Sequence, residues 1–271
     1  MEPATVVVTL SDRAYAARVM RTIRDVRGPG RYWGPIVWIA IDFDPSKNFC
    51  DLYEVTIWRR SRLDTSALDA QLRARPFTGG DGRERIKTIQ WSKIHAFDPG
   101  FAQWRRAIFM DAGLRVFRSI DPVLAHPWEE SIIALDDSHP DDVKRFGCQL
   151  ETTADPAAFA RLVDLVKGDP THERYFLNCF WIYDTKLGGE QTQQELRALM
   201  EQMPVFRTNE MGAMNVHFHL LRRAWRPLTI DRIDEQGEKL PILFDWSERD
   251  GRTWRDYVML KYPTTINFED T

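Results

Sequence analysis

Short runs of apolar, often β-branched residues recur along the chain and predict buried strands. They are Thr5–Leu10, Ile36–Ile41, Tyr53–Trp58, Arg106–Met110, Ile132–Leu135 and Cys179–Tyr183. Runs with so little polar interruption are typical of strands buried on both faces of a parallel sheet. The pattern therefore predicts a sheet in the interior of the molecule.

Helical periodicity separates these runs. After the first strand, apolar residues recur at helical spacing from Tyr15 to Val26, until Gly28-Pro29-Gly30 breaks the segment. Further helices are predicted over Asp64–Arg73, Glu84–Phe97 (as an amphipathic helix), Ala157–Val166, Glu190–Met203 and Asn209–Arg222. Strand, helix and strand in this order predict right-handed parallel crossovers.

Two segments lack such patterns. Residues 60–83 are mostly polar and contain Gly79-Gly80-Asp81-Gly82, which we interpret as a candidate mobile flap. Residues 225–271 are rich in Pro, Trp and charge, and we expect an irregular segment packed on the core.

The element order predicts a single α/β domain over residues 1–271, with a mixed, mainly parallel sheet flanked by helices. Ligands of such folds bind at the carboxyl ends of the strands, which nominates Ser11, Asp42 and Asp111. Neither GxGxxG after the first strand nor GxxxxGK[ST] occurs, which argues against dinucleotide and P-loop sites.

The composition argues against several classes of protein. The formal net charge of −3 lacks the basic excess of a nucleic-acid-binding protein. Three isolated cysteines favour a reducing compartment, and no apolar run approaches the roughly 20 residues that span a bilayer. Without a signal-peptide pattern, we expect a cytoplasmic protein with no transmembrane segment. Ten tryptophans fit a large core, but also a pocket that stacks on flat ligands.

The segment Gln90–Leu124 resembles the core of retaining GT-A glycosyltransferases, such as the family 8 and glycogenin-like enzymes. In those enzymes a lysine-bearing helix precedes a strand that ends in Asp-x-Asp, as IFMDAG does here in part. The stretches TVVVTLSDRAY, RYFLNCFWIYDT and TNEMGAMN resemble further motifs of the family, in the same order. The resemblance implies a GT-A fold and transfer of a hexose or pentose from a nucleotide-diphosphate donor to a glycan or other hydroxyl acceptor, with retention of stereochemistry.

The resemblance also implies roles for individual residues. Leu10, Ser11, Tyr15, Asp111, Ala112 and Gly113 would bind the nucleotide of the donor. Lys93, and Lys261 in the MLKYP run near the C-terminus, would contact the diphosphate. Asn178 and Glu210 would lie at the transferred sugar as catalytic residues, together with Asp111.

The sequence departs from the family at Gly113, which replaces the second carboxylate of Asp-x-Asp. A Mn²⁺ or Mg²⁺ site there loses an oxygen ligand. Either Asp111 and another group hold the cation, or cationic side chains neutralise the diphosphate instead. The sequence leaves both alternatives open.

Each candidate also has a plainer interpretation. Asp111 and Asp184 would cap turns, Lys93 and Lys261 would be solvated surface lysines, and Glu210 would be a charge at a helix start. His217 and His219 are two residues apart and cannot easily share one metal ion on a helix. As a whole, the chain could be a catalytically silent protein of this fold that binds a glycan or protein partner. A nucleotidyltransferase is disfavoured because SDRAYAAR contains no Gly-rich phosphate loop.

Overall fold

The computed structural model describes residues 4–78, 87–138 and 144–266. The segment Gly79–Gly82, which we interpreted as a flap, lies outside the described residues. Among the described helices, none is long and apolar enough to cross a membrane.

A seven-stranded sheet forms the centre of the molecule, with strand order β3-β2-β1-β4-β7-β6-β8. Its strands are β1 (Thr5–Ser11), β2 (Ile36–Ile41), β3 (Val55–Arg60), β4 (Arg106–Met110), β6 (Ile132–Asp136), β7 (Phe176–Asp184) and β8 (Trp225–Pro227). All neighbouring strands pair in parallel except at β7, which runs antiparallel to both β4 and β6. The predicted mixed, mainly parallel sheet is confirmed.

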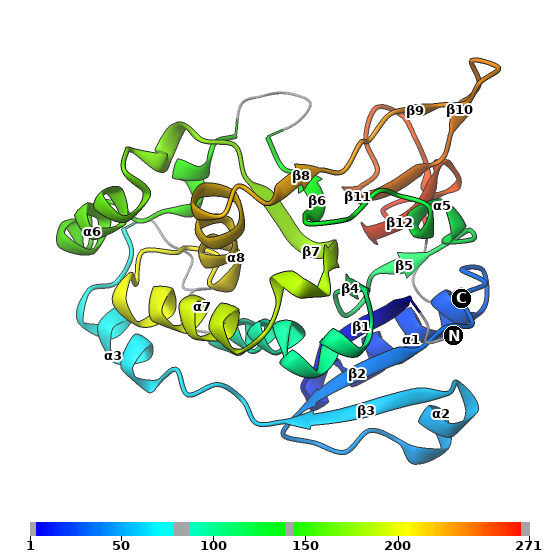
Figure 1. The fold of residues 1–271 in the computed structure, drawn as a ribbon, viewed down its shortest axis with the longest axis horizontal. Helices are drawn as coiled ribbons and strands as arrows, with labels where there is room; N and C mark the ends of the chain where they lie inside the picture. Colours follow the sequence, from blue (N-terminus) through cyan, green and yellow to red (C-terminus); the bar gives the residue numbers. More distant parts are fainter. Residues whose placement is uncertain (1–3, 79–86, 139–143, 267–271) are drawn as a thin grey trace.

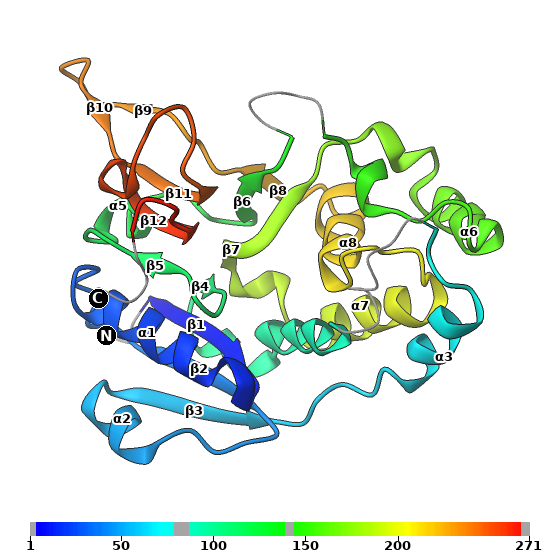
Figure 2. The ribbon, with the colours of Figure 1, turned by 180° about the vertical axis from the view of Figure 1, so that it is seen from behind.

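Helices cover this sheet and extend beyond one end of it. The α-helices are α1 (Ala16–Arg27), α2 (Lys47–Leu52), α3 (Ser66–Ala74), α5 (Asp121–Leu124), α6 (Pro156–Val166), α7 (Glu190–Gln202) and α8 (Glu210–Met214). In both views α3, α6, α7 and α8 gather at one end of the molecule, and β1–β3 with α1 and α2 at the other (Figures 1 and 2). Helix α8 continues as a π-helix over Asn215–Leu221, so the predicted helix Asn209–Arg222 is confirmed in extent but not in winding.

The predicted amphipathic helix over Glu84–Phe97 begins at residues outside the described part of the chain, and within the described part the prediction of an amphipathic α-helix is wrong. Thr88–Phe97 forms a 3₁₀ helix, and eight of its ten residues are buried. The segment lies between α7 and the strands β1 and β2, so it is enclosed on nearly all sides. A one-sided apolar pattern assumes one solvated face, and here the surrounding elements leave almost none.

The expectation of an irregular C-terminal segment is also wrong. Beyond β8, this segment contains β9 (Arg232–Ile233), β10 (Lys239–Leu240), β11 (Ile242–Ser247) and β12 (Tyr257–Tyr262). Strand β8 joins the edge of the main sheet, and β12 pairs with β11 and with β5 (Arg115–Val116). Strands β8 and β12 pair with β6 and β5, which lie more than 90 residues earlier in the sequence, so local patterns did not show these pairings.

A buried ion pair fastens the small sheet β11-β12-β5 to the main body. Arg115 in β5 places its Nε atom 2.5 Å from Oδ2 of Asp25 in α1, and both side chains are buried. The backbone N–H of Val116 donates to the same oxygen at 3.3 Å. Strand β5, and with it β12, is thereby fixed relative to α1.

Aromatic packing forms the core between β4 and β7. The rings of Phe109 and Trp181 stack with centroids 3.8 Å apart and an interplanar angle of 10°. The Phe97 ring is also stacked with Trp181, with ring centroids 6.1 Å apart and an interplanar angle of 17°. All three side chains are fully buried. They hold rigid the two strands whose ends carry Asp111 and Asn178.

Candidate active site

A cavity of about 490 Å³ lies beyond the carboxyl end of β4 and is bordered by β7, α8 and β12. A smaller hollow of about 130 Å³ adjoins it and reaches the carboxyl end of β1. The two spaces share Lys93, Asp111 and Lys261 among their lining residues. Together they form one site with a smaller and a larger compartment, at the edge where ligands of parallel sheets bind.

Asp111 stands where the compartments meet. It follows β4, and its backbone N–H donates to the Cys179 carbonyl at 2.9 Å, which fixes the residue against β7. Its side chain is 23% exposed and therefore reaches the cavity. Burial alone would raise the pKa of Asp111, but the ammonium groups of Lys261 and Lys93 outweigh burial and lower it. Asp111 is thus a carboxylate at neutral pH and not merely a turn cap.

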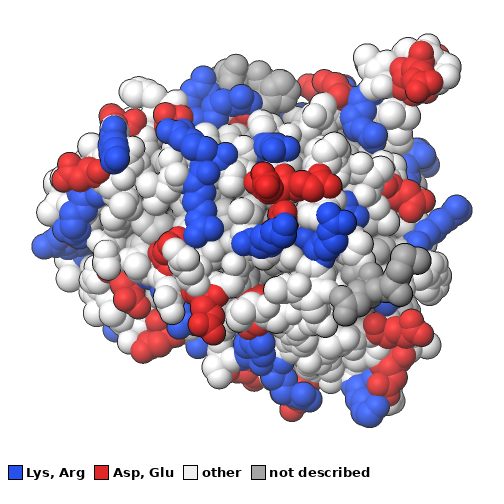
Figure 3. Space-filling model, in the orientation of Figure 1, with Lys and Arg blue, Asp and Glu red and all other residues white. Residues whose placement is uncertain are grey.

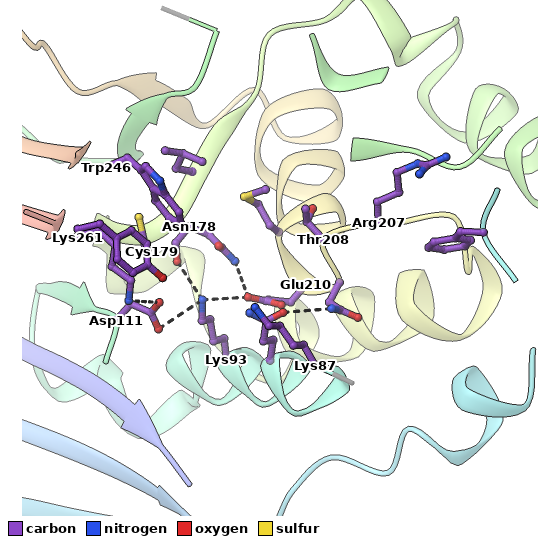
Figure 4. Close-up of a pocket in the computed structure, with 16 residues that line it drawn as sticks. Lys87, Lys93, Asp111, Asn178, Cys179, Arg207, Thr208, Glu210, Trp246 and Lys261 are labelled. Carbon is purple, nitrogen blue, oxygen red and sulfur yellow. Dashed lines mark hydrogen bonds and ion pairs between the residues drawn. The ribbon is translucent and has the colours of Figure 1, made fainter. Parts of the chain in front are cut away.

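Lys93 enters the site from the 3₁₀ helix and is buried (Figure 4). Its Nζ atom lies 3.1 Å from Glu210 Oε1 and 3.6 Å from Asp111 Oδ1, and it donates to the Asn178 carbonyl at 3.4 Å. Burial would lower the pKa of Lys93, but the two carboxylates overcome burial and raise it. The side chain remains charged, and its burial excludes the interpretation as a solvated surface lysine.

Lys261 reaches the same carboxylate from the opposite side. It donates to Asp111 Oδ2 at 2.8 Å and to the Ala112 carbonyl at 2.7 Å. The residue is buried, although its neighbour Tyr262 is exposed. Its position follows from β12, because the pairing of Leu260 with Arg115 aims the strand at the loop after β4. The interpretation as a solvated tail lysine is therefore excluded.

Glu210 and Asn178 complete the group. The side-chain amide of Asn178 donates to Glu210 Oε1 at 2.8 Å. Glu210 begins α8 and is buried, and its Oε2 atom has no hydrogen-bond partner among the described residues. Burial raises the pKa of Glu210, although Lys93 and Asn178 act in the opposite direction. A carboxyl group held this way lines a cavity and keeps one oxygen unpaired.

The smaller compartment contains most of the residues expected to bind a nucleotide, but not Gly113. Leu10, Ser11, Tyr15 and Ala112 line it, as does Arg18. The Ser11 hydroxyl accepts a hydrogen bond from Trp38 Nε1 at 3.1 Å, so it also anchors a core side chain. The Tyr15 ring is 41% exposed, and the Arg18 guanidinium lies 5.1 Å from its centroid. An exposed ring with a neighbouring cation is suited to stacking on a planar base.

Other predicted residues lie away from the site. Gly113 is not among the lining residues and faces α1, where its N–H donates to Thr22 Oγ1 at 3.2 Å. Asp42 borders a separate shallow hollow beside Arg59. Asp184 accepts from the backbone N–H groups of Glu130 and Lys186, which is the expected cap.

The side chains of His217 and His219 point toward different partners, as two residues this close on a helix are expected to do. His217 Nδ1 lies 3.3 Å from a Glu195 oxygen, whereas His219 Nε2 lies 3.8 Å from Glu173. They cannot bind one metal ion together.

Sequence reasoning missed several residues that line the site, among them Arg18, Lys87, Trp246 and Tyr262. Arg18 lies one helical turn after Tyr15, so the helical spacing could have found it. Lys87 lines both compartments, but it follows a polar segment without a recognisable pattern. Trp246 and Tyr262 border the larger cavity with their rings 4.8 Å apart. No local signal unites the latter pair, because β11 and β12 bring them together.

The residues around Asp111 do not fit a divalent cation. Among residues 4–78, 87–138 and 144–266, no group of three or more His, Cys, Asp or Glu residues could hold a metal ion. Both Asp111 oxygens face ammonium groups. Gly113, at the second acidic position of the motif, has φ +83° and packs against Arg18. Mn²⁺ and Mg²⁺ prefer several oxygen ligands, whereas Asp111 is already paired with ammonium groups and Glu210, the other carboxylate that lines the cavity, is held by Lys93 and Asn178.

The strand order, the single antiparallel strand and the site at the carboxyl edge define the GT-A fold of nucleotide-sugar glycosyltransferases. No family model and no curated protein matches the sequence. Solved structures do match. The galactosyltransferase LgtC, in complex with donor and acceptor sugar analogues, superposes with a TM-score of 0.53 at 11% identity, over 83% of this chain and 73% of that chain.

Two further solved structures are similar to this chain. The Mn/GDP form of core-mannan synthase A (CmsA/Ktr4) from Aspergillus fumigatus gives a TM-score of 0.51 at 8% identity, over 83% of this chain and 72% of that chain. The glycosyltransferase GlyE of Streptococcus pneumoniae TIGR4 also gives 0.51, at 14% identity, over 83% of this chain and 45% of that chain. At these identities the similarity establishes the fold.

Proposed function

We propose that this protein is a glycosyltransferase that moves a sugar from a nucleotide-diphosphate donor to a hydroxyl acceptor. One observation carries the proposal: five polar side chains from separate segments of a GT-A fold converge on a single cavity. They are Lys93, Asp111, Asn178, Glu210 and Lys261. Burial of charged groups is destabilising unless they are paired. Charged groups gathered around a cavity are therefore typical of a functional site.

The two compartments suit the two parts of such a donor. The nucleoside would lie in the smaller one, with its base against Tyr15. Lys93 and Lys261, at the junction, would face the diphosphate. The sugar would then project into the larger cavity, toward Asn178 and Glu210.

In the reaction, the bond between the anomeric carbon and the diphosphate oxygen breaks, and its electron pair leaves with the diphosphate. The acceptor oxygen bonds to that carbon, and its proton passes to the departing diphosphate. Fixed ammonium groups beside the leaving diphosphate would stabilise its growing negative charge. The Glu210 carboxyl would face the positive charge that develops on the sugar ring. We propose retention of configuration on the basis of the family resemblance.

For the acceptor, we propose a glycan. Trp246 is 39% exposed and Tyr262 is 42% exposed, and both border the larger cavity. Exposed aromatic rings at a cavity mouth offer the flat apolar surface on which a sugar ring stacks.

Incubation of the protein with a panel of nucleotide sugars, with and without glycan acceptors, tests the proposal through release of nucleoside diphosphate. We expect slow hydrolysis of one donor, acceleration by an acceptor, and loss of turnover in Glu210→Gln. Lys239→Met, an exposed change in β10, should leave the rate unchanged. Binding without turnover would support the catalytically silent alternative, and absence of both would refute the proposal.

A further inference from the structure

We infer that two lysine ammonium groups, those of Lys93 and Lys261, bind the donor diphosphate in this protein in place of a divalent cation. The inference rests on the proposed function and specifies the electrostatics of that site. The ligand is a nucleoside diphosphate, recognised as an anion without a bridging metal.

The first argument is where the positive charges lie. Lys93 comes from the 3₁₀ helix before β4, and Lys261 comes from β12 near the end of the chain. Their ammonium groups meet at opposite oxygens of Asp111, at the junction of the two compartments (Figure 4). A donor that spans both compartments would place its diphosphate at this junction.

The second argument is the donor capacity that remains. An ammonium group has three N–H donors. Lys261 uses two of them, on Asp111 Oδ2 and the Ala112 carbonyl. Lys93 makes one short contact, to Glu210 Oε1 at 3.1 Å, while its distances to the Asn178 carbonyl and Asp111 are 3.4 and 3.6 Å. Each lysine can therefore donate to a phosphate oxygen without losing its closest partner.

The third argument is what a cation would meet. It would have to displace Lys261 from a carboxylate at 2.8 Å and remain beside two positive charges, which repel it. The left-handed backbone at Gly113 turns that position toward α1, so the loop cannot offer a second carboxylate without rearranging. Asp111 is thus a positioning residue that aligns the two lysines.

Calorimetric titration of the full chain with UDP, GDP, ADP, CDP and dTDP tests the inference. Each titration is performed once in EDTA and once in Mn²⁺. We expect one nucleotide to bind with affinities that agree within about threefold in the two buffers. Adding the protein to a mixture of Mn²⁺ and that nucleotide should not decrease the paramagnetic resonance signal of free Mn²⁺ beyond the decrease that the nucleotide alone causes.

Substitution of each lysine tests whether its ammonium group binds the diphosphate. Lys261→Met and Lys93→Met should each weaken binding in EDTA about tenfold or more, because a charge-assisted hydrogen bond is lost. Lys239→Met, the same chemical change on an exposed strand, should have no effect. Lys261→Arg keeps the charge with different geometry and should fall between Lys261→Met and the unchanged protein.

The outcomes separate the inference from the function on which it rests. Binding that requires Mn²⁺ and disappears in EDTA would overturn the inference and leave the transferase proposal standing. If no nucleotide binds in either buffer, the proposed function itself fails. Should a lysine variant not fold, the comparison of EDTA with Mn²⁺ on the unaltered protein still decides.

Discussion

Two side chains of the site, Asp111 and Lys93, keep their charge although burial opposes it, because each lies beside groups of opposite charge. Asp111 and Lys93 keep their charges through each other and through Lys261 and Glu210. In contrast, burial raises the pKa of the Cys179 thiol, which also lines the cavity, to about 12. Cys179 therefore lines the site as an uncharged thiol and does not act as a nucleophile.

The proposed acceptor surface can be tested at Trp246. Trp246→Ala removes one ring of the exposed pair that borders the larger cavity, and we expect the KM for the glycan acceptor to rise several-fold. Because this ring does not border the smaller compartment, the KM for the donor should change little. Initial rates with each substrate varied in turn measure both. Equal increases in the two constants would contradict an acceptor role.

His217 makes stability depend on pH. Burial, assisted by the charge of Arg222, lowers the pKa of His217 from 6.5 to about 4. Between pH 6.5 and about 4, His217 is protonated in the unfolded chain but neutral in the folded protein. The stability contributed by neutral His217 is therefore present above pH 6.5 and is lost as the pH falls toward 4.

The variant His217→Gln is neutral at every pH and isolates this effect. Between pH 7 and 5 we expect the unaltered protein to lose on the order of 2 kcal/mol more unfolding free energy than the variant. Urea denaturation of both proteins at the two pH values provides the measurement. Parallel losses would show that His217 does not titrate this way.

Elements far apart in sequence hold the site together, and β12 is the clearest example. This strand brings Lys261 to Asp111, and it is held by β5, which is tied to α1 through Asp25 and Arg115. The loop after β4 lies between these elements. The position of Lys261, for which we propose phosphate binding, thus depends on a buried ion pair outside the cavity.

Asp25→Ala should destabilise the protein by about 3 kcal/mol, because a buried guanidinium loses the carboxylate 2.5 Å from it. Asp44→Ala provides the matched control, since the ion pair of Asp44 with Arg59 is largely exposed. That change should cost less than about 1 kcal/mol. Chemical denaturation measures both, and equal costs would show that the Asp25 pair does not fasten the small sheet.

The whole molecule places its charges without a dominant sign. On the face shown in Figure 3, positive and negative side chains are interspersed. With a net charge of −3, attraction of an anionic donor depends on the local charges in the cavity rather than on a long-range field.

Because β8 joins the edge of the main sheet, we propose that the chain is one domain and expect one cooperative unfolding transition. The bound nucleoside diphosphate would contact residues from β1, β4 and β12. At a concentration 100 times its Kd it should add about 2.7 kcal/mol to the unfolding free energy. Differential scanning calorimetry should show a single peak that shifts upward by roughly 5 °C. Two separate peaks, only one of which responds, would contradict the single unit.

Local patterns predicted the parts of the fold that depend on local physics. The runs TVVVTL, IVWIAI, RAIFM and CFWIYD became buried strands, because short runs rich in apolar β-branched and aromatic residues favour strands that are buried on both faces of a sheet. For the same reason Asp111, the polar residue that ends RAIFM, was expected at the rim of the sheet, and the structure places it there.

The sequence by itself thus determined the α/β class, the strand positions and the candidate residues, because each depends on the periodicity or chemistry of neighbours in the chain. Only the tertiary structure decided which candidates meet. Lys261 and Asp111 are 150 positions apart, and Trp246 and Tyr262 become neighbours only through the pairing of β11 with β12. Ion pairing at Asp111 likewise depends on which side chains surround it, since the field of nearby charges acts through space and not along the backbone.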